Sequence, residues 1–242
     1  MAAIPIRRSP HPEIEVRIHE ALQARRLERE ASGPKRRLRL SRIGDCARKL
    51  WALAHGHEDE EIPGSRIAIF DMGNSVEDLV ISWLRSAGYT VQRTQKTVTM
   101  IPEVDGHIDG EIWLEHSRFD VEPAILEVKS ANKEQFELCV AQGYDTWRPA
   151  YGDTVQTYMG ASGVHVAMAI VLCKDNSRIY AEKLRFDADR YKRLQEKAQV
   201  VLTSERPLPR PEEATSQYCS FCKWCHLNET CWGPTFDVQF DA

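Results

Sequence analysis

Two short runs between Gly106 and Lys129 constrain the fold of this chain more than any other part of the sequence. The first run reads G-H-I-D-G and places Asp109 before a glycine near the end of an apolar segment, and the second reads A-I-L-E-V-K. Residues two apart on a β-strand point to the same face, so Glu127 and Lys129 project together on the face of Ile125. If the two runs pair as an antiparallel hairpin, Asp109 comes to lie beside Glu127.

Two carboxylates with a lysine close by suit the chemistry of holding a divalent metal ion against a phosphate. An isolated E-x-K is common in soluble proteins, where it usually belongs to a solvated charged face. This one lies on an apolar strand, behind an aspartate on a preceding strand flanked by glycine, and that placement favours the functional interpretation. The rest of the chain is therefore expected to add parts to the same site.

The composition is that of a globular protein. The 242 residues are 42% hydrophobic and 28% charged, and this length suffices for one large domain or one domain with appendages. The net charge of −4 neither indicates nor excludes nucleic-acid binding, because local patches matter more than the total. No apolar run approaches the roughly 20 residues that span a bilayer, and the N-terminus lacks the apolar segment of a signal peptide. We therefore expect a cytoplasmic protein without a membrane partner.

Hydrophobic periodicity predicts helices and strands along the whole chain. The clearest helix covers residues 66–87 and ends before Gly88, which is a favourable residue after a helix. Its apolar stripe consists of Ile69, Met72, Val76, Val80, Trp83 and Ala87. Residues 1–10 are expected to be disordered. The other predicted elements are a charged helix at 12–31, a short helix after Ser41, strands at 90–101, 106–115, 122–130, 164–173 and 177–185, and helices at 132–147, 151–162 and 187–203.

The cysteines form a pattern of their own. Four of the seven fall within thirteen residues near the C-terminus, which in a cytoplasmic protein indicates metal ligands rather than disulfides. Cys139 and Cys173 lie in apolar segments and are expected in the core. The remaining five are Cys46, Cys219, Cys222, Cys225 and Cys231.

A dense basic run, P-K-R-R-L-R-L-S-R, occupies residues 34–42. One interpretation is a solvated linker. The other is a contact surface for the phosphate backbone of DNA, because lysine and arginine supply the sequence-independent part of DNA affinity. The candidate DNA contacts are Arg36, Arg37, Arg39 and, on the following short helix, Lys49.

The predicted order of helix, three strands, helix and strand, with Asp109 on the second strand and E-V-K on the third, resembles the PD-(D/E)XK nuclease superfamily. The chain is most similar to its RecB-like exonucleases with an iron–sulfur cluster, including CRISPR-associated and phage-encoded members and the nuclease domains of some helicase–nucleases. The resemblance covers roughly residues 38–232. It implies an α/β, restriction-endonuclease-like αβββαβ core with a mixed central sheet flanked by helices, and terminal segments joined by a metal cluster with four cysteine ligands. The implied parts are an N-terminal arm at 1–36, a nuclease core at 37–205 and a cysteine segment at 206–242.

The resemblance also implies the ligands of that cluster. The family has one cysteine before the core and three after it, spaced C-x2-C-x5-C, and four thiolates are the normal complement of a 4Fe–4S cluster. Here the matching residues are Cys46, Cys222, Cys225 and Cys231. A Zn²⁺ site with four cysteines, or with three and His226, is an alternative, as is a set of free thiols. Cys219 also stands at the x2 spacing from Cys222 and could replace one of the ligands.

The catalytic site implied by the resemblance holds one or two Mg²⁺ or Mn²⁺ ions. Lys129 would orient or help deprotonate a bound water and stabilise developing negative charge. Glu77, in M-G-N-S-V-E, occupies the position of the family's helical ligand, although a solvated boundary residue is the alternative. Ile108 stands where the superfamily name has proline, a common departure. The implied metal ligands are Glu77, Asp109, Glu127 and the carbonyl of Val128.

The family's Q-x-x-x-Y motif is matched only in part. Tyr158 fits the tyrosine, which would contact the substrate strand, but Thr154 stands where the glutamine is expected. Gln156 lies close to that position and is a weaker candidate for a role. The catalytic residues implied by the resemblance are thus Asp109, Glu127, Lys129 and Tyr158.

These assignments predict a metal-dependent exonuclease that hydrolyses phosphodiester bonds of single-stranded DNA or duplex ends. The sequence contains no G-x-x-x-x-G-K-[ST] motif of a helicase motor, which favours phage recombination, repair or CRISPR-type DNA processing, with recombination or CRISPR proteins as partners. The alternative is a non-catalytic DNA-binding or assembly partner that retains the nuclease fold and carries a structural Zn²⁺ site. Intact Asp109, Glu127 and Lys129 favour the enzyme.

Overall fold

The computed structural model describes residues 11–32, 38–57, 62–117, 120–219, 221–223, 225–233 and 236. The predicted disorder of residues 1–10 and the candidate DNA contacts Arg36 and Arg37 lie outside these ranges. The chain divides into two compact units. Residues 1–35 and 61–74 form the first unit, and residues 36–60 and 75–242 form the second.

The first unit contains α1 (Pro12–Ser32) and the beginning of α3 (Gly64–Ser86). Arg25 of α1 forms an ion pair with Asp71 of α3. Gly64 lies directly against the backbone of His19, where a Cβ atom would clash. An exposed ion pair and a close backbone approach therefore contribute to the packing of these two helices. Both predicted helices are confirmed within a few residues of their bounds.

The predicted apolar stripe of α3 is wrong in part. Val80 is buried as expected, but the side chains of Ile69, Met72 and Trp83 are 60%, 55% and 40% exposed. Ile67 and Ile81, which are not part of the predicted stripe, are buried as well. Which side of a helix is buried depends on the surface that it packs against, and the three- and four-residue periodicity does not identify that surface.

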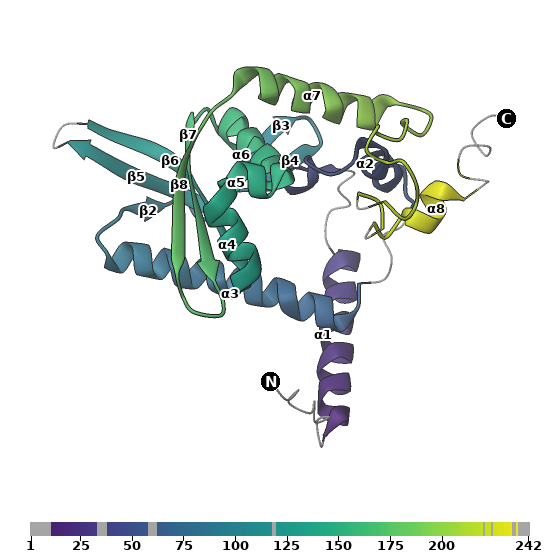
Figure 1. Cartoon of the computed structure of the whole chain (residues 1–242), viewed down its shortest axis with the longest axis horizontal. Helices are drawn as coiled ribbons and strands as arrows, with labels where there is room; N and C mark the ends of the chain where they lie inside the picture. The colour runs from purple at the N-terminus through teal and green to yellow at the C-terminus, as the bar shows by residue number, and fades with distance from the viewer. Residues whose placement is uncertain are drawn as a thin grey trace. The chain divides into compact units, whose positions relative to one another are not determined.

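The second unit is built around a five-stranded mixed sheet in the order β2-β5-β6-β7-β8. β5 and β6 pair antiparallel, β6 and β7 pair parallel, and β7 and β8 pair antiparallel (Figure 1). The predicted mixed sheet with flanking helices is confirmed. Its strands are β2 (Val91–Gln92), β5 (Gly110–Ser117), β6 (Asp120–Ala131), β7 (Val166–Cys173) and β8 (Ile179–Arg185).

The prediction of two long strands over residues 90–115 is wrong, because four shorter strands occupy this stretch. Arg93 and Gln95 adopt φ angles of 50° and 56°, which lie outside the strand region and end β2. β3 (Thr97–Ile101) and β4 (Val104–His107) leave the main sheet and join β1 (Leu38–Arg39) in a second sheet of order β1-β4-β3. Asp109 therefore lies in the bend between β4 and β5 rather than on a strand.

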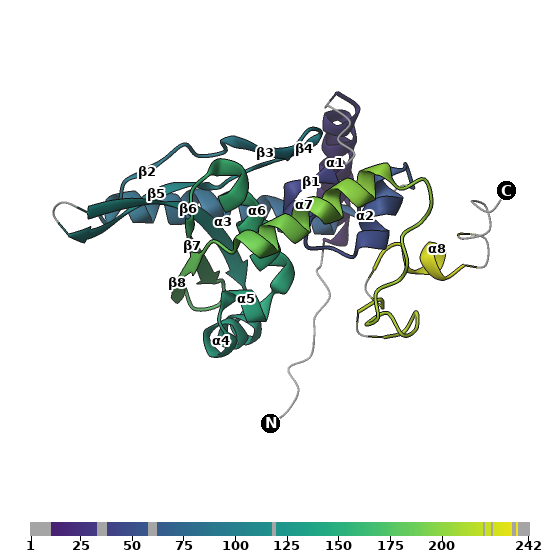
Figure 2. The ribbon, with the colours of Figure 1, turned by 90° about the horizontal axis from the view of Figure 1, so that it is seen from above.

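Helices cover both faces of the main sheet. One face, with Leu126, Val128 and Ile170, packs against the second half of α3. The other face, with Ile125 and Val171, packs against α4 (Lys133–Gln142), α5 (Tyr144–Trp147) and α6 (Pro149–Ser162). The helix predicted over 132–147 is thus two helices, because Gly143 interrupts it with a φ of 83°. α7 (Ala188–Thr203) packs on α6 and on α2 (Ala47–Ala54) (Figure 2).

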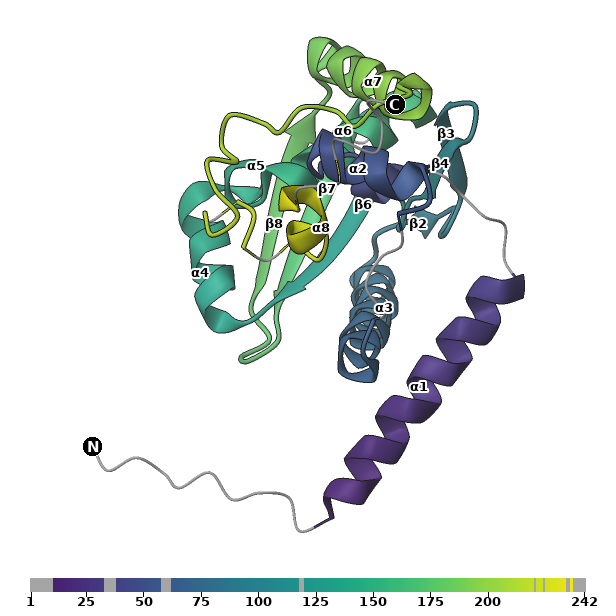
Figure 3. The same ribbon diagram turned by 90° about the vertical axis from the view of Figure 1, so that its right-hand side faces the viewer.

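The C-terminal segment packs against α2, which lies far from it in sequence. Trp51 forms a small cluster with Leu227 and Phe236, and its Nε1 donates a hydrogen bond to the carbonyl of Ser204 at 2.8 Å. α8 (Asn228–Trp232) lies beside α2 in this arrangement (Figure 3). The main chain before α2 forms a short 3₁₀ helix, Leu40–Arg42. Within the described ranges, no helix has the length and apolar character needed to cross a membrane.

Candidate active site

The β5–β6 pairing brings Asp109 and Glu127 together. Gly110 pairs with Leu126, so the residue before Gly110 stands opposite the residue after Leu126. The Oδ2 atom of Asp109 accepts a hydrogen bond from the backbone N–H of Val128 at 2.7 Å. The pairing predicted from the two runs is therefore present in the structure.

Glu127 is buried on β6 and is joined to Lys129 on the same face of the strand. The Nζ atom of Lys129 lies 2.5 Å from Oε1 of Glu127 and donates a hydrogen bond to the carbonyl of Val128 at 3.3 Å. Burial alone would lower the pKa of the Lys129 ammonium, but the carboxyl groups of Glu127 and Asp109 hold that pKa well above its usual value. Lys129 is therefore a cation at neutral pH.

Three carboxyl groups share this single lysine as a nearby cation. Burial first, and then the charge of Glu127, raise the pKa of Asp109 to about 8. Burial also raises the pKa of Glu77 on α3, and the charge of Lys129 acts on it in the opposite sense. The Nε2 atom of Gln95 donates a hydrogen bond to Oε1 of Glu77 at 2.7 Å. Burial is the largest cause of both raised pKa values, and neighbouring carboxyl groups add to it, because three carboxyl groups surround one lysine here.

The residues fit a divalent cation by their chemistry. Among the residues that the structure describes, Oε2 of Glu127 is buried and has no hydrogen-bond partner. Carboxylate and carbonyl oxygens are the ligands that Mg²⁺ and Mn²⁺ prefer, and a cation would offset the excess negative charge. In the present side-chain positions, however, no three His, Cys, Asp or Glu side chains of the described ranges are arranged closely enough to hold a metal ion.

Glu111 is a residue of this region that the sequence interpretation missed. It follows Asp109 by two positions, is 1% exposed, and forms ion pairs with Arg93 at 2.7 Å and Lys96 at 3.2 Å. These two ion pairs fix both ends of the loop that carries Gln95. A buried carboxylate thus holds the loop whose glutamine orients Glu77. The sequence did contain a signal for Glu111, because an acidic residue two positions after Asp109 points to the same side of an extended chain.

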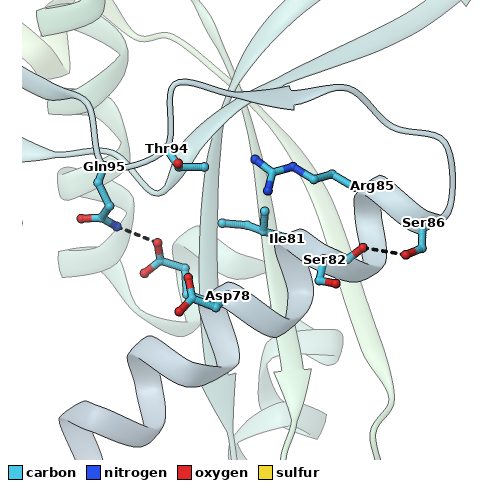
Figure 4. Close-up of a pocket in the computed structure, with 8 residues that line it drawn as sticks. Asp78, Ile81, Ser82, Arg85, Ser86, Thr94 and Gln95 are labelled. Atoms are coloured by element: carbon cyan, nitrogen blue, oxygen red, sulfur yellow. Dashed lines mark hydrogen bonds between the residues drawn. The ribbon is translucent and has the colours of Figure 1, made fainter.

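An open cleft with a volume of about 590 Å³ adjoins Glu77 (Figure 4). The second half of α3 forms one wall, and the loop after β2 forms the other. Arg85 of α3 is fixed by two hydrogen bonds to the carbonyl of Val91, at 3.2 and 3.0 Å. The cleft is mostly polar, and its lining residues are Glu77, Asp78, Ile81, Ser82, Arg85, Ser86, Thr94 and Gln95.

Helix α6 brings Tyr158 toward the site but turns Gln156 away from it. Tyr158 is 4% exposed, and burial followed by the charge of Glu127 raises its pKa. Gln156 donates to the carbonyl of Arg185 and accepts from the backbone N–H of Asp187, both at 2.9 Å. The glutamine therefore holds the junction between β8 and α7. Contact of Tyr158 with a substrate strand stays a prediction.

The structure also draws together the cysteines that were assigned to one metal centre. The thiol of Cys225 lies within electrostatic range of Cys46 and Cys231, and that of Cys222 lies within range of Cys231. The buried Arg48 donates a hydrogen bond to the sulfur of Cys231 at 3.2 Å. Residue 46 and the C-terminal cysteines thus meet in space, although the described residues do not form a metal-binding geometry as they stand.

Two further residues from the sequence interpretation occupy definite positions near these cysteines. Cys219 exchanges a hydrogen bond with Cys222. Although burial acts to raise its pKa, hydrogen bonds from Ser216 and Cys222 lower the pKa of the Cys219 thiol to about 7. Lys49, a candidate DNA contact, forms an ion pair with Asp45 at 2.8 Å. Arg39 is exposed on β1.

Solved structures with a similar fold include two exonuclease structures. The alkaline exonuclease LHK-Exo from Laribacter hongkongensis, alone and in complex with dAMP, matches with a TM-score of 0.51 and 14% identity. Each match covers 68% of this chain, together with 84% of the exonuclease alone and 85% of its dAMP complex. The crystal structure of SSO0001 matches with a TM-score of 0.53 and 13% identity, over 92% of this chain and 98% of that one.

At these identities the similarity shows the fold alone, which this chain shares with the alkaline exonuclease and with SSO0001. The sequence matches no protein-family model and no curated protein.

Proposed function

We propose that this protein is a divalent-metal-dependent deoxyribonuclease that removes nucleotides from DNA ends. The observation that carries the proposal is the meeting of Asp109, Glu127 and Lys129 at the β5–β6 pairing, within electrostatic range of Glu77 on α3. The fold that the chain shares with an alkaline exonuclease supports the same reaction class. The dAMP in one structure of that exonuclease is a nucleotide of DNA.

Different side chains have different roles in the proposed hydrolysis. Glu77, Asp109, Glu127 and the carbonyl of Val128 would hold one or two Mg²⁺ or Mn²⁺ ions. Such ions, when bound, polarise a phosphodiester and lower the pKa of a bound water. Lys129, kept positively charged by its neighbours, orients the attacking water and stabilises negative charge on the phosphate. Gln95 holds the Glu77 carboxyl in position through its hydrogen bond.

A second part of the proposal concerns the cysteines. Cys46, Cys222, Cys225 and Cys231 would hold a structural 4Fe–4S cluster, with Zn²⁺ as the alternative. The thiols of these residues already lie near one another, and Arg48 donates a hydrogen bond to one of the sulfurs. Buried thiolates need such donors and cations to offset their charge. The cluster would tie α2 to the C-terminal segment.

The substrate would be single-stranded DNA or the ends of duplex DNA. The cleft between α3 and the loop after β2 opens beside Glu77 and offers hydroxyl, amide and guanidinium groups to a strand that leaves the site. The setting would be phage recombination, repair or CRISPR-type processing, with proteins of those systems as partners. A non-catalytic DNA-binding partner with a zinc site is the second candidate, and it requires only that the fold binds DNA.

A digestion assay on end-labelled single- and double-stranded DNA, with Mg²⁺ or Mn²⁺, tests the proposal. We expect end-dependent release of nucleotides by the wild type, and loss of at least roughly 100-fold in rate for Asp109→Asn and Lys129→Ala. Lys183→Ala is the matched control, because Lys183 lies on β8 and forms an ion pair with Glu122. Thermal unfolding should show that all three variants fold. DNA binding without cleavage by the wild type in every metal would favour the non-catalytic alternative.

A further inference from the structure

Tyr144, a tyrosine with no role in the site as described so far, is an electrostatic neighbour of Glu127, Asp109 and Lys129. Tyr144 opens α5 directly after Gly143, whose φ of 83° turns the chain out of α4. Its backbone N–H donates a hydrogen bond to Oε2 of Glu182 at 2.7 Å, and the hydroxyl of Tyr180 donates to the same oxygen at 2.6 Å. The backbone of Tyr144 is therefore fixed to β8, which determines where its side chain can point.

The hydroxyl of Tyr144 is buried and has no hydrogen-bond partner among the residues that the structure describes. The side chain is 0% exposed, and its hydroxyl oxygen is inaccessible to solvent. Burial above all, with the charge of Glu127 next, holds the pKa of Tyr144 well above its usual value, so the hydroxyl keeps its proton. Buried polar groups without a partner are rare and costly, so a bound ligand that offers an acceptor to this hydroxyl would be stabilised by it.

A second unpartnered atom lies close by. Oε2 of Glu127 is also buried without a hydrogen bond, and Glu127, Lys129 and Asp109 are all electrostatic neighbours of Tyr144. The donor and the acceptor do not bond to each other. A carboxylate oxygen suits a metal ion, whereas a neutral hydroxyl suits an anionic oxygen. The pair therefore matches the two sides of a metal-bound phosphate.

Tyr151 of α6 is an aromatic neighbour of both Lys129 and Tyr144. The Nζ atom of Lys129 lies 5.6 Å from the ring centroid of Tyr151, and the rings of Tyr144 and Tyr151 lie 6.2 Å apart. Lys129 and Tyr144 thus lie next to the same ring. A phosphate bound by both residues would receive one hydrogen bond from an ammonium and one from a hydroxyl.

We propose that Tyr144 is a further catalytic residue, whose hydroxyl donates a hydrogen bond to a non-bridging oxygen of the bound phosphodiester. This inference rests on the proposed nuclease function. The bond strengthens as negative charge accumulates on that oxygen during attack by water, and the proton stays on the tyrosine throughout. Donors aimed at developing charge lower the barrier more than they tighten substrate binding.

Tyr144→Phe tests the inference by removing the hydroxyl and keeping the ring. We expect kcat for DNA cleavage to fall by ~10- to 100-fold, with KM changed by less than about threefold. We also expect an unchanged or higher Tm, because the variant lacks the unpartnered buried group. Tyr191→Phe is the matched control, because this tyrosine on α7 accepts a hydrogen bond from Gln195 at 3.3 Å and lies outside the site. Its kcat should equal that of the wild type.

Binding of dAMP in the presence of Ca²⁺, measured by calorimetry, separates this inference from the proposed function. We expect Tyr144→Phe to bind dAMP about 10-fold more weakly than the wild type, because the monoester phosphate of dAMP already carries the additional negative charge that a phosphodiester gains only during attack. If the wild type cleaves DNA and Tyr144→Phe cleaves equally fast, the inference is overturned and the nuclease stands. If the wild type cleaves no DNA, the proposed nuclease function is wrong. In that case the inference about Tyr144 is also overturned if the wild type and Tyr144→Phe bind dAMP equally, or if neither binds it. A clearly lower Tm for Tyr144→Phe would show that the hydroxyl has a partner within the folded chain, which also overturns it.

Discussion

At the scale of the residue, the candidate site is dominated by unbalanced charge. Asp109, Glu127 and Glu77 all lie within the electrostatic influence of one another, and Lys129 is the cation that they share. The pKa of Asp109 is raised to about 8 by burial and by Glu127. Burying several carboxyl groups together destabilises the folded chain, and a bound cation would offset this destabilisation. Binding of a metal ion and stability of the fold should therefore be coupled.

The first prediction concerns this coupling. Mn²⁺ at 100 times its Kd should stabilise the wild type by about 2.7 kcal/mol, which corresponds to a Tm increase of roughly 5–10 °C for a chain of this size. Asp109→Asn should keep a Tm close to that of the wild type in EDTA at pH 7, because a pKa of about 8 leaves the Asp109 carboxyl mostly protonated without a metal ion, and it should lose most of the Mn²⁺ effect. Differential scanning fluorimetry measures both. An Mn²⁺ effect that is equal in the two proteins would contradict a metal site at Asp109.

The second prediction concerns Gln95, which donates a hydrogen bond to Glu77 at 2.7 Å. Residues that orient metal ligands typically contribute 10- to 100-fold to metal affinity, so Gln95→Ala should raise the Kd for Mn²⁺ by about 10-fold. Its Tm in EDTA should stay near the wild-type value, because the side chain is exposed. Thr94→Ala, on the same loop and in the same cleft, is the control. Calorimetric titration would speak against the orienting role if both variants bind Mn²⁺ alike.

At the scale of the element, the position of α6 depends on two close contacts with α7. The ring of Tyr191 lies directly on Gly160, where a Cβ atom would clash. Arg190 forms ion pairs with Asp145 at 2.6 Å and Asp153 at 2.8 Å, and these connect α7 to both α5 and α6. Since α5 and α6 carry Tyr144 and Tyr158, the packing of α7 determines how far these tyrosines stand from β6.

The third prediction follows from that packing. Gly160→Ala should reduce the free energy of unfolding by ~1–3 kcal/mol, the usual cost of overpacking a tightly packed position. Gly73→Ala is the control, because a Cβ at that helical position meets no atom within 4 Å. There the free energy of unfolding should rise by up to roughly 1 kcal/mol. Urea denaturation distinguishes the two. Equal effects of both substitutions would show that the Gly160–Tyr191 contact can relax without cost.

At the scale of the second unit as a whole, the cysteines lie on segments at opposite ends of its sequence. Cys46 precedes α2, and Cys225 and Cys231 lie in the C-terminal segment that packs on α2 through Trp51 and Leu227. The hydrophobic contact there is small. A cross-link between such distant residues restricts the unfolded chain strongly, by analogy with a disulfide that closes a long loop.

The fourth prediction concerns the cluster. Protein purified anaerobically should be brown and absorb at roughly 400 nm, because thiolate-bound iron has charge-transfer bands in this region. Cys225→Ser should lose this absorbance and its iron, and should unfold more easily by ~4–5 kcal/mol. Cys219→Ser should keep both, because the cluster is assigned without Cys219. Metal analysis decides the outcome. Zinc in place of iron would support the Zn²⁺ alternative, and loss of the absorbance in Cys219→Ser would move one ligand from the assigned set to Cys219.

The sequence by itself determined the features that depend on neighbouring residues along one strand or helix. Alternation of apolar and charged residues put Glu127 and Lys129 on one face of β6, and the pairing predicted between the two runs brought Asp109 beside Glu127. The apolar run of residues 164–173 predicted a strand, and β7 occupies most of that range, with its residues buried almost throughout. These features follow from backbone geometry and side-chain polarity over short distances.

Only the tertiary structure decided which residues from distant segments surround that strand. The positive φ angles of Arg93 and Gln95 end β2 early, although neither residue type favours that conformation, because Glu111 holds the loop from the neighbouring strand. The buried, unpartnered hydroxyl of Tyr144 is visible only once α5 packs beside β6. Burial and long-range ion pairs change a residue's environment without leaving a local pattern, and for this reason the sequence did not reveal them.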